Sequence, residues 1–118
     1  MDSRKKSLLS SNDYRNCIQS GIERFRTAAP LTYAELAKDS QIQTTYLTNV
    51  LKGRAHFNAD QIFAVTHRLG FSTQEQDYCL LLLEWERTQN LKRRNLLKSR
   101  LDLIRNENLK TEDRGKDK

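Results

Sequence analysis

The chain has 118 residues, which is enough for one domain with a modest hydrophobic core. Charged residues make up 31% and hydrophobic residues 36% of it, and only four glycines and one proline are present, so the composition favours a small helical protein over one built from hairpins. The net charge of +6 favours a polyanionic partner, and the longest apolar run, Cys79 to Leu83, is far too short to cross a membrane.

Residues 1 to 11 are polar and basic, and we expect them to form a flexible N-terminus. A basic arm of this kind could also wrap a duplex. The basic residues at positions 4 to 6 precede only two leucines, which does not fit a secretory signal. Cys17 and Cys79 lie far apart without a C-x-x-C motif, so we expect reduced core thiols in a cytoplasmic protein.

A first helix is expected from a cap at Asn12 or Asp13 to about Arg26. Its apolar residues recur every three or four positions and define one buried stripe: Tyr14, Ile18, Ile22 and Phe25. Gly21 lies beside this stripe, where a residue without a side chain indicates close packing.

Residues 32 to 54 predict two short helices joined by a tight turn. Thr32 and Glu35 have the spacing of a capping box, so they mark the start of the first. Leu36 and Ala37 face inward, and Ile42 is a lone apolar residue suited to filling the corner between the helices.

The second of these helices is expected from about Gln43 and closes at Gly53. Its apolar residues are spaced for one buried face: Leu47, Val50 and Leu51. Its polar residues occupy the outer face: Thr44, Thr45, Thr48, Asn49 and Lys52.

Two more helices follow, each opened by a capping box: Asn58 with Gln61, and Ser72 with Glu75. The apolar band of the second, from Tyr78 to Trp85, is too wide for one contact face, so we expect it to pack on two partners. One partner would be the helical core, and the other a second subunit.

From Leu91 a narrow apolar seam of heptad type runs through a basic segment. Residues 91 to 107 carry six basic and two acidic side chains, whereas residues 72 to 90 carry one basic and four acidic. We favour a bend near Gln89 and Asn90 over one continuous helix. The expected dimer interface combines residues of both segments: Tyr78, Leu82, Trp85, Leu97, Leu101 and Ile104. Residues 108 to 118 are predicted to be a disordered charged tail.

The pattern L-T-x-x-E-L-A, an aliphatic corner residue, a polar helix and x-x-G-[KR] resembles the phage-repressor (Xre/Cro-like) helix-turn-helix family, without a gap from Leu31 to Gly70. The segment Tyr78 to Glu84 also resembles the Y-x-L-L-x-L ending of a subgroup of bacterial regulators. The resemblance implies an all-α, five-helix bundle with a C-terminal helical extension. It divides the chain into a DNA-binding domain over residues 12 to 72 and a dimerisation extension over residues 73 to 107.

In that family the second helix of the motif reads base edges in the major groove near its N-terminal end. By position, the resemblance implies DNA contacts from eight residues here: Tyr33, Gln43, Thr44, Thr45, Thr48, Asn49, Lys52 and Arg54. Thr44 and Thr45 match the main base-reading sites, and Tyr33 matches a bracing site. Asn can bond adenine and a Thr methyl can touch thymine, so A·T-containing half-sites are expected.

Two departures from the family pattern matter. Gln41 occupies the turn position that is usually Gly, so a residue with a side chain has to adopt a positive φ there. The predicted reading helix also lacks Arg, which argues against strong guanine recognition.

No pattern in the chain predicts an enzyme. His56 and His67 have no Cys or acidic residue at metal-ligand spacing, and neither a nucleophile motif nor a Gly-rich phosphate loop is present. We therefore expect no catalytic residue, metal or cofactor.

These features together predict a sequence-specific DNA-binding transcriptional regulator, a repressor by family resemblance, that acts as a cytoplasmic homodimer on a palindromic site of double-stranded DNA. A second interpretation is a protein-binding adaptor, such as an antitoxin, that uses its apolar C-terminal helix. A third is a nonspecific nucleic-acid binder acting through the basic segment after Leu91.

Overall fold

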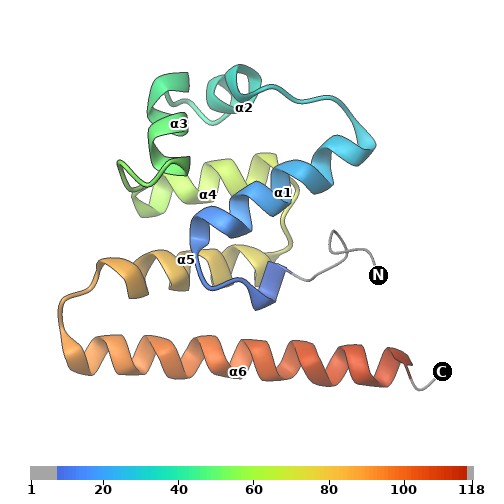
Figure 1. Ribbon diagram of the computed structural model, residues 1–118, viewed down its shortest axis with the longest axis vertical. Helices are drawn as coiled ribbons and strands as arrows, with labels where there is room; N and C mark the ends of the chain where they lie inside the picture. Colours follow the sequence, from blue (N-terminus) through green and yellow to red (C-terminus); the bar gives the residue numbers. More distant parts are fainter. Residues whose placement is uncertain (1–7, 117–118) are drawn as a thin grey trace.

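The computed structural model describes residues 8 to 116, with side chains described to residue 110. This part of the chain contains helices and no strands, which confirms the all-α prediction. A single 3-10 turn precedes six α-helices (Figure 1): η2 Leu8–Ser10, α1 Tyr14–Ala28, α2 Tyr33–Asp39, α3 Thr44–Leu51, α4 Ala59–Arg68, α5 Thr73–Arg87 and α6 Leu91–Lys116.

The helices begin where local side chains satisfy the free N–H groups of their first turns. The three predicted capping boxes, at the starts of α2, α4 and α5, are all present. In the α4 box, Gln61 N–H donates to Asn58 Oδ1 at 2.8 Å, and Asn58 N–H donates to Gln61 Oε1 at 2.9 Å. Asp13 caps α1 by accepting from the N–H of Arg15 at 2.8 Å.

The turn between α2 and α3 has the conformation that its sequence predicts. Gln41 adopts φ = 61°, so a side chain does occupy a left-handed position. Ile42 then packs against the core, and its N–H donates to the carbonyl of Ala37 at 3.0 Å. These contacts fix α3 at an angle to α2.

The core lies among α1 to α5, and it also includes Leu8 and Leu9 of the 3-10 turn and Leu101 of α6. The α1 stripe is buried as predicted, except that Phe25 is half-buried. Gly21 marks a close approach, because a Cβ at this position would lie 2.2 Å from the Phe71 ring. The ring therefore occupies the space that any side chain at Gly21 would need.

The second face of α5 packs on α6 of the same chain, where the sequence predicts a second subunit. Tyr78 and Leu82 are 0% exposed, and Leu97 and Leu101 are also buried. Trp85 and Ile104 are partly buried against the same core. The four buried side chains therefore have almost no surface left for another subunit, whereas Trp85 and Ile104 keep part of theirs.

The link between α5 and α6 bends where the sequence predicts it. α5 ends at Arg87, and α6 begins at Leu91 after three non-helical residues. Asn90 Oδ1 accepts from the N–H of Arg93 at 3.0 Å, which caps the new helix. α6 then runs back alongside α5 (Figure 1).

Both expectations for the chain ends need correction. Leu8 and Leu9 are buried, and the carbonyl of Ser11 accepts from the Tyr78 hydroxyl at 2.5 Å and from Arg105 Nη2 at 3.2 Å, so residues 8 to 11 are held in place. Residues 1 to 7 lie outside the described residues. At the other end, residues 108 to 116 continue α6, where a disordered tail was expected. They lack proline, and five of the nine are good helix formers: Leu109, Lys110, Glu112, Arg114 and Lys116. Residues 117 and 118 lie outside the described residues.

Cys17 and Cys79 are free and buried, as expected. Across the described residues, no helix combines the length and the apolar character that a membrane span requires.

Candidate nucleic-acid interface

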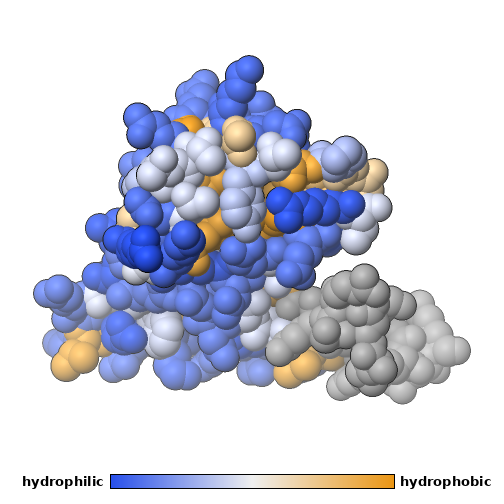
Figure 2. Space-filling view, turned by 45° about the horizontal axis from the view of Figure 1, so that its top comes forward, coloured by the Kyte–Doolittle hydropathy of each residue, from blue (hydrophilic) through white to orange (hydrophobic). Residues whose placement is uncertain are grey.

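The outer face of α3 is open to solvent in this chain. Leu47 and Val50 anchor the helix in the core. Figure 2 shows the end of the molecule that carries α2 and α3 as largely polar, with hydrophobic colour limited to small patches. The five predicted contact residues on or next to this face are exposed or half-exposed: Gln43, Thr44, Thr45, Thr48 and Asn49.

The N-terminal end of α3 is polar and uncapped by its own side chain. Gln43 occupies the cap position and makes no side-chain hydrogen bond to the first turn. The backbone N–H groups of that turn are therefore available to an external acceptor, and the helix dipole favours a negatively charged one. Thr44 and Thr45 lie in this turn and are exposed.

Thr48 differs from the other two threonines. Its hydroxyl donates to the carbonyls of Thr44 at 3.0 Å and Thr45 at 2.9 Å. Because that donor is engaged within the helix, Thr48 has its methyl group and hydroxyl lone pairs left for an outside contact. Asn49 makes no hydrogen bond through its side chain to residues 8 to 110, so its amide can still donate and accept.

Tyr33 contacts side chains of α1, Gln19 and Arg26, and not the outer face of α3. Its hydroxyl donates to Gln19 Oε1 at 3.4 Å, and the guanidinium of Arg26 lies 5.4 Å from its ring centre. The predicted bracing of Thr44 and Thr45 by Tyr33 has no contact to support it among the described side chains.

Lys52 and Arg54 are exposed and follow α3 directly. Gly53 lies between them with φ = 84°, and Arg54 N–H donates to the carbonyl of Asn49 at 2.8 Å. This left-handed closure turns the chain sharply at the end of the helix. Seven of the eight predicted contact residues therefore lie on α3 or at its ends, and Tyr33 lies at the start of α2.

Side chains from neighbouring helices hold α3 and the loop after it. The Tyr46 hydroxyl donates to Gln61 Oε1 at 2.9 Å and also to the carbonyl of His56. Arg15, on α1, donates from Nε to the carbonyl of Val50 at 2.7 Å. Sequence reasoning missed Arg15, because nothing local distinguishes it from other surface cations.

His56 lies within the same network and is held neutral. Its Nδ1 lies 2.9 Å from the Tyr14 hydroxyl and 3.3 Å from Arg15 Nη2. A guanidinium can only donate, so Nδ1 is the acceptor and the ring proton sits on Nε2. Burial and the positive charges of Arg15 and Arg87 lower the pKa of His56 below its usual value.

Two acidic groups beside Arg15 are affected by their surroundings. Burial, and then the carboxylate of Asp13, raise the pKa of Glu86 to about 7, although Arg15 opposes the shift from 3.4 Å. Burial also raises the pKa of the Tyr14 hydroxyl to about 12. Glu86 is therefore partly protonated near neutral pH.

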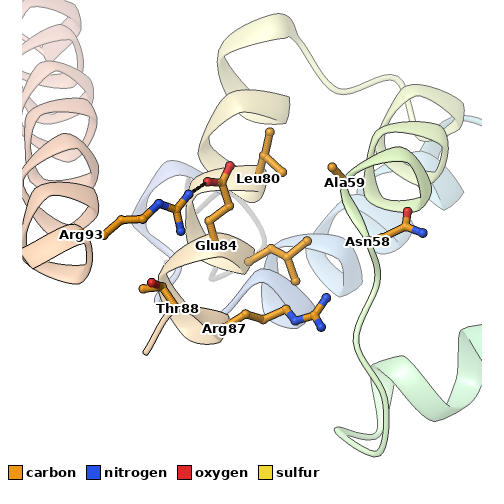
Figure 3. A pocket seen from close by; sticks show the side chains of 8 residues that line it. Asn58, Ala59, Leu80, Glu84, Arg87, Thr88 and Arg93 are labelled. Carbon is orange, nitrogen blue, oxygen red and sulfur yellow. Dashed lines mark hydrogen bonds and ion pairs between the residues drawn. The ribbon is translucent and has the colours of Figure 1, made fainter. Parts of the chain in front are cut away.

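A hollow of about 400 Å³ lies between the start of α4, the end of α5 and the start of α6 (Figure 3). Glu84 and Arg93 form an ion pair across its wall, and Arg87 Nη1 donates to the carbonyl of Phe57 at 3.3 Å. Its charged groups are thus already engaged with the protein. The hollow is open to solvent and is lined by Asn58, Ala59, Leu80, Leu83, Glu84, Arg87, Thr88 and Arg93.

Among the described residues, no group of three or more His, Cys, Asp or Glu side chains is placed to hold a metal ion. In comparisons with known proteins, no protein-family model and no curated protein matches the sequence, and no solved structure matches the fold.

Proposed function

We propose that this protein is a sequence-specific DNA-binding transcriptional regulator, acting as a repressor, that places α3 in the major groove. The observation that carries the proposal is the accessible, polar, uncapped N-terminal half of a short helix that is anchored in a packed core by Leu47 and Val50. The cations Lys52 and Arg54 flank that helix at its other end, where they can reach phosphates.

The proposed regulator binds as a homodimer in the cytoplasm. A single short helix with few strong base contacts distinguishes its site only weakly from other DNA. Two copies on a palindrome would multiply their ratios of specific to nonspecific affinity. Reading helices of such a dimer would lie about 34 Å apart. The dimer contact has to use surface outside the side chains already packed between α5 and α6.

The test begins with selection of preferred duplexes from a random pool, followed by affinity measurement on the selected sequence. Replacing Thr44 and Thr45 by Ala together should weaken binding to that sequence by roughly 1–3 kcal/mol per lost base contact and leave nonspecific binding unchanged. Thr73→Ala with Gln74→Ala, at the exposed start of α5, is the matched control. Sedimentation of the complex should give two chains per duplex.

Failure to prefer any duplex over random competitor would reject the proposal. Equal affinity of the α3 variant and its control would reject α3 as the reading helix. A binding constant that depends steeply on salt but not on sequence would instead favour a nonspecific binder.

One observation favours a protein-binding adaptor as the second candidate. Four large apolar side chains on α6 remain exposed: Leu91 by 75%, Leu96 by 52%, Leu103 by 64% and Leu109 by 55%. Exposed leucines of this kind can mark a protein contact. If the protein is an adaptor, Leu96→Ser with Leu103→Ser should abolish its effect in the cell, whereas the double variant of Thr44 and Thr45 should keep it. If the protein is a regulator, the double variant of Thr44 and Thr45 should have the larger effect.

A further inference from the structure

The loop from Gly53 to Phe57 is anchored in the core mainly at its last residue. Phe57 is its one fully buried side chain and Ala55 packs partly against the core, whereas Arg54 and His56 are exposed. Loop residues with exposed side chains open easily unless polar contacts hold their backbone. Here polar contacts do so, since helices α1, α3 and α5 all donate to carbonyls of the loop.

Arg15 supplies the contacts that join this loop to the end of α3. Its side chain is only 15% exposed, although it is charged. Nε donates to the carbonyl of Val50 at 2.7 Å, and Nη2 donates to the carbonyl of Ala55 at 3.0 Å. One planar guanidinium therefore connects the last turn of the helix to a residue five positions later.

The surroundings of Arg15 keep the guanidinium in this orientation. Its Nη1 lies 3.4 Å from Glu86 on α5 and 3.8 Å from Asp13, which precedes α1. Its carbon Cζ lies 4.7 Å from the centre of the Tyr14 ring. A fork of five N–H donors can satisfy helix, loop and carboxylate together, which a single ammonium group cannot do.

We propose that Arg15 is a positioning residue, which fixes the segment from Lys52 to His56 against the end of α3 so that Lys52 and Arg54 meet DNA phosphates in register with the helix. This inference rests on the proposed function. Arg15 itself is covered by the protein, so it acts through those two cations and does not bind phosphate.

The test compares the salt dependence of affinity for the selected duplex in Arg15→Lys, Arg15→Met and wild type. The logarithmic salt slope counts neutralised phosphates, at roughly 0.9 per contact. In both variants the salt slope should decrease by the equivalent of up to about two phosphate contacts. Arg15→Lys keeps the positive charge. A reduced salt slope in this variant would therefore show that the branched guanidinium, and not the charge alone, is needed.

Arg24→Met is the matched control. Arg24 also lies on α1, forms ion-pair contacts of 2.7 and 3.1 Å with Glu75, and lies over the Phe71 ring. It has no contact with the loop, so its loss should lower stability and leave the salt slope at the wild-type value. Equal slope changes in the Arg24 and Arg15 variants would overturn the proposal.

A double-variant comparison separates positioning from a general structural effect. In a background with Lys52→Ala and Arg54→Ala, replacing Arg15 by Lys should change the slope no further, because the residues through which Arg15 acts are gone. An additional loss of similar size in that background would overturn the proposal.

Hydrogen exchange of the Arg54 amide tests the positioning without DNA. This N–H donates to the carbonyl of Asn49 at 2.8 Å. It should exchange about tenfold faster in Arg15→Lys than in wild type or Arg24→Met, because local opening becomes easier. Unchanged exchange would overturn the positioning role even if DNA binding is real. Faster exchange in a protein that prefers no duplex would reject the proposed function and keep the role of Arg15 in holding the loop.

Discussion

At the scale of single residues, Gln41 is the clearest case of local strain. It holds a left-handed conformation at φ = 61°, which an L-residue adopts at a cost because its Cβ approaches the following backbone. Gln41 is exposed, so its side chain gains no buried contact in return.

Replacing Gln41 by Gly should therefore raise the free energy of unfolding by about 1 kcal/mol, measured by urea denaturation. Gln41→Ala keeps the Cβ and serves as the control, with stability close to wild type. A less stable glycine variant would show that the turn conformation is not strained.

Glu86 should make stability depend on pH. Its folded-state pKa is raised to about 7 by burial and by Asp13, whereas the unfolded chain releases the same proton near the ordinary value of 4.5. Between these values the folded state binds the proton more tightly, so this group's contribution to stability falls as pH rises from about 4.5 to 7. His56 acts in the opposite direction, because its lowered pKa makes its protonation unfavourable in the folded state.

Glu86→Gln removes one of these two contributions. The free energy of unfolding of the variant minus that of wild type should increase by roughly 1–3 kcal/mol as the pH rises from 5 to 8, measured by denaturation at each pH. Glu23→Gln, an exposed position on α1, is the control. A wild-type-to-variant difference that stays constant across this range would contradict the prediction.

At the scale of elements, the pairing of α5 with α6 is the main difference from expectation. The heptad-type seam of α6 is real, but it packs on α5 and on the 3-10 turn of its own chain. Arg105 supports this packing by donating to the Tyr78 hydroxyl at 2.7 Å. Arg94 Nη1 also donates to the carbonyl of Trp85 at 2.9 Å. The seam therefore contributes to the stability of the fold.

Leu101→Ala tests this arrangement. Truncating a fully buried leucine should cost about 2–5 kcal/mol of unfolding free energy. Leu103→Ala, two residues along and exposed, should change stability by less than about 0.5 kcal/mol. Sedimentation should give the same oligomeric state for both. If Leu101→Ala dissociates a dimer without loss of stability, the seam is an interface between subunits.

The elements were predictable because their signals are short-range. Capping boxes, the closing Gly53 and the corner residue Ile42 all act within a few positions, and each has its expected place. The packing partner of α6 was not predictable, since an apolar seam looks the same whether its own chain or another covers it. Arg15 was missed for a related reason: its partners lie 35 and 40 positions away in the sequence.

At the scale of the whole molecule, the helices are stacked in layers along its longest axis (Figure 1). α2 and α3 lie at one end and α6 lies at the other, with α1, α4 and α5 between them (Figure 1). Residues 91 to 110 of α6 carry seven basic and two acidic side chains, so positive charge is also present far from α3. In the proposed complex these cations would face away from the duplex that α3 reads.

The separation between α3 and α6 decides whether two ligands can bind at the same time. A partner bound to the exposed leucines of α6 would not clash with a nucleic acid bound to α3 at the opposite end of the molecule. The two occupancies would then be independent, and each would titrate at the same midpoint whether or not the other site is filled.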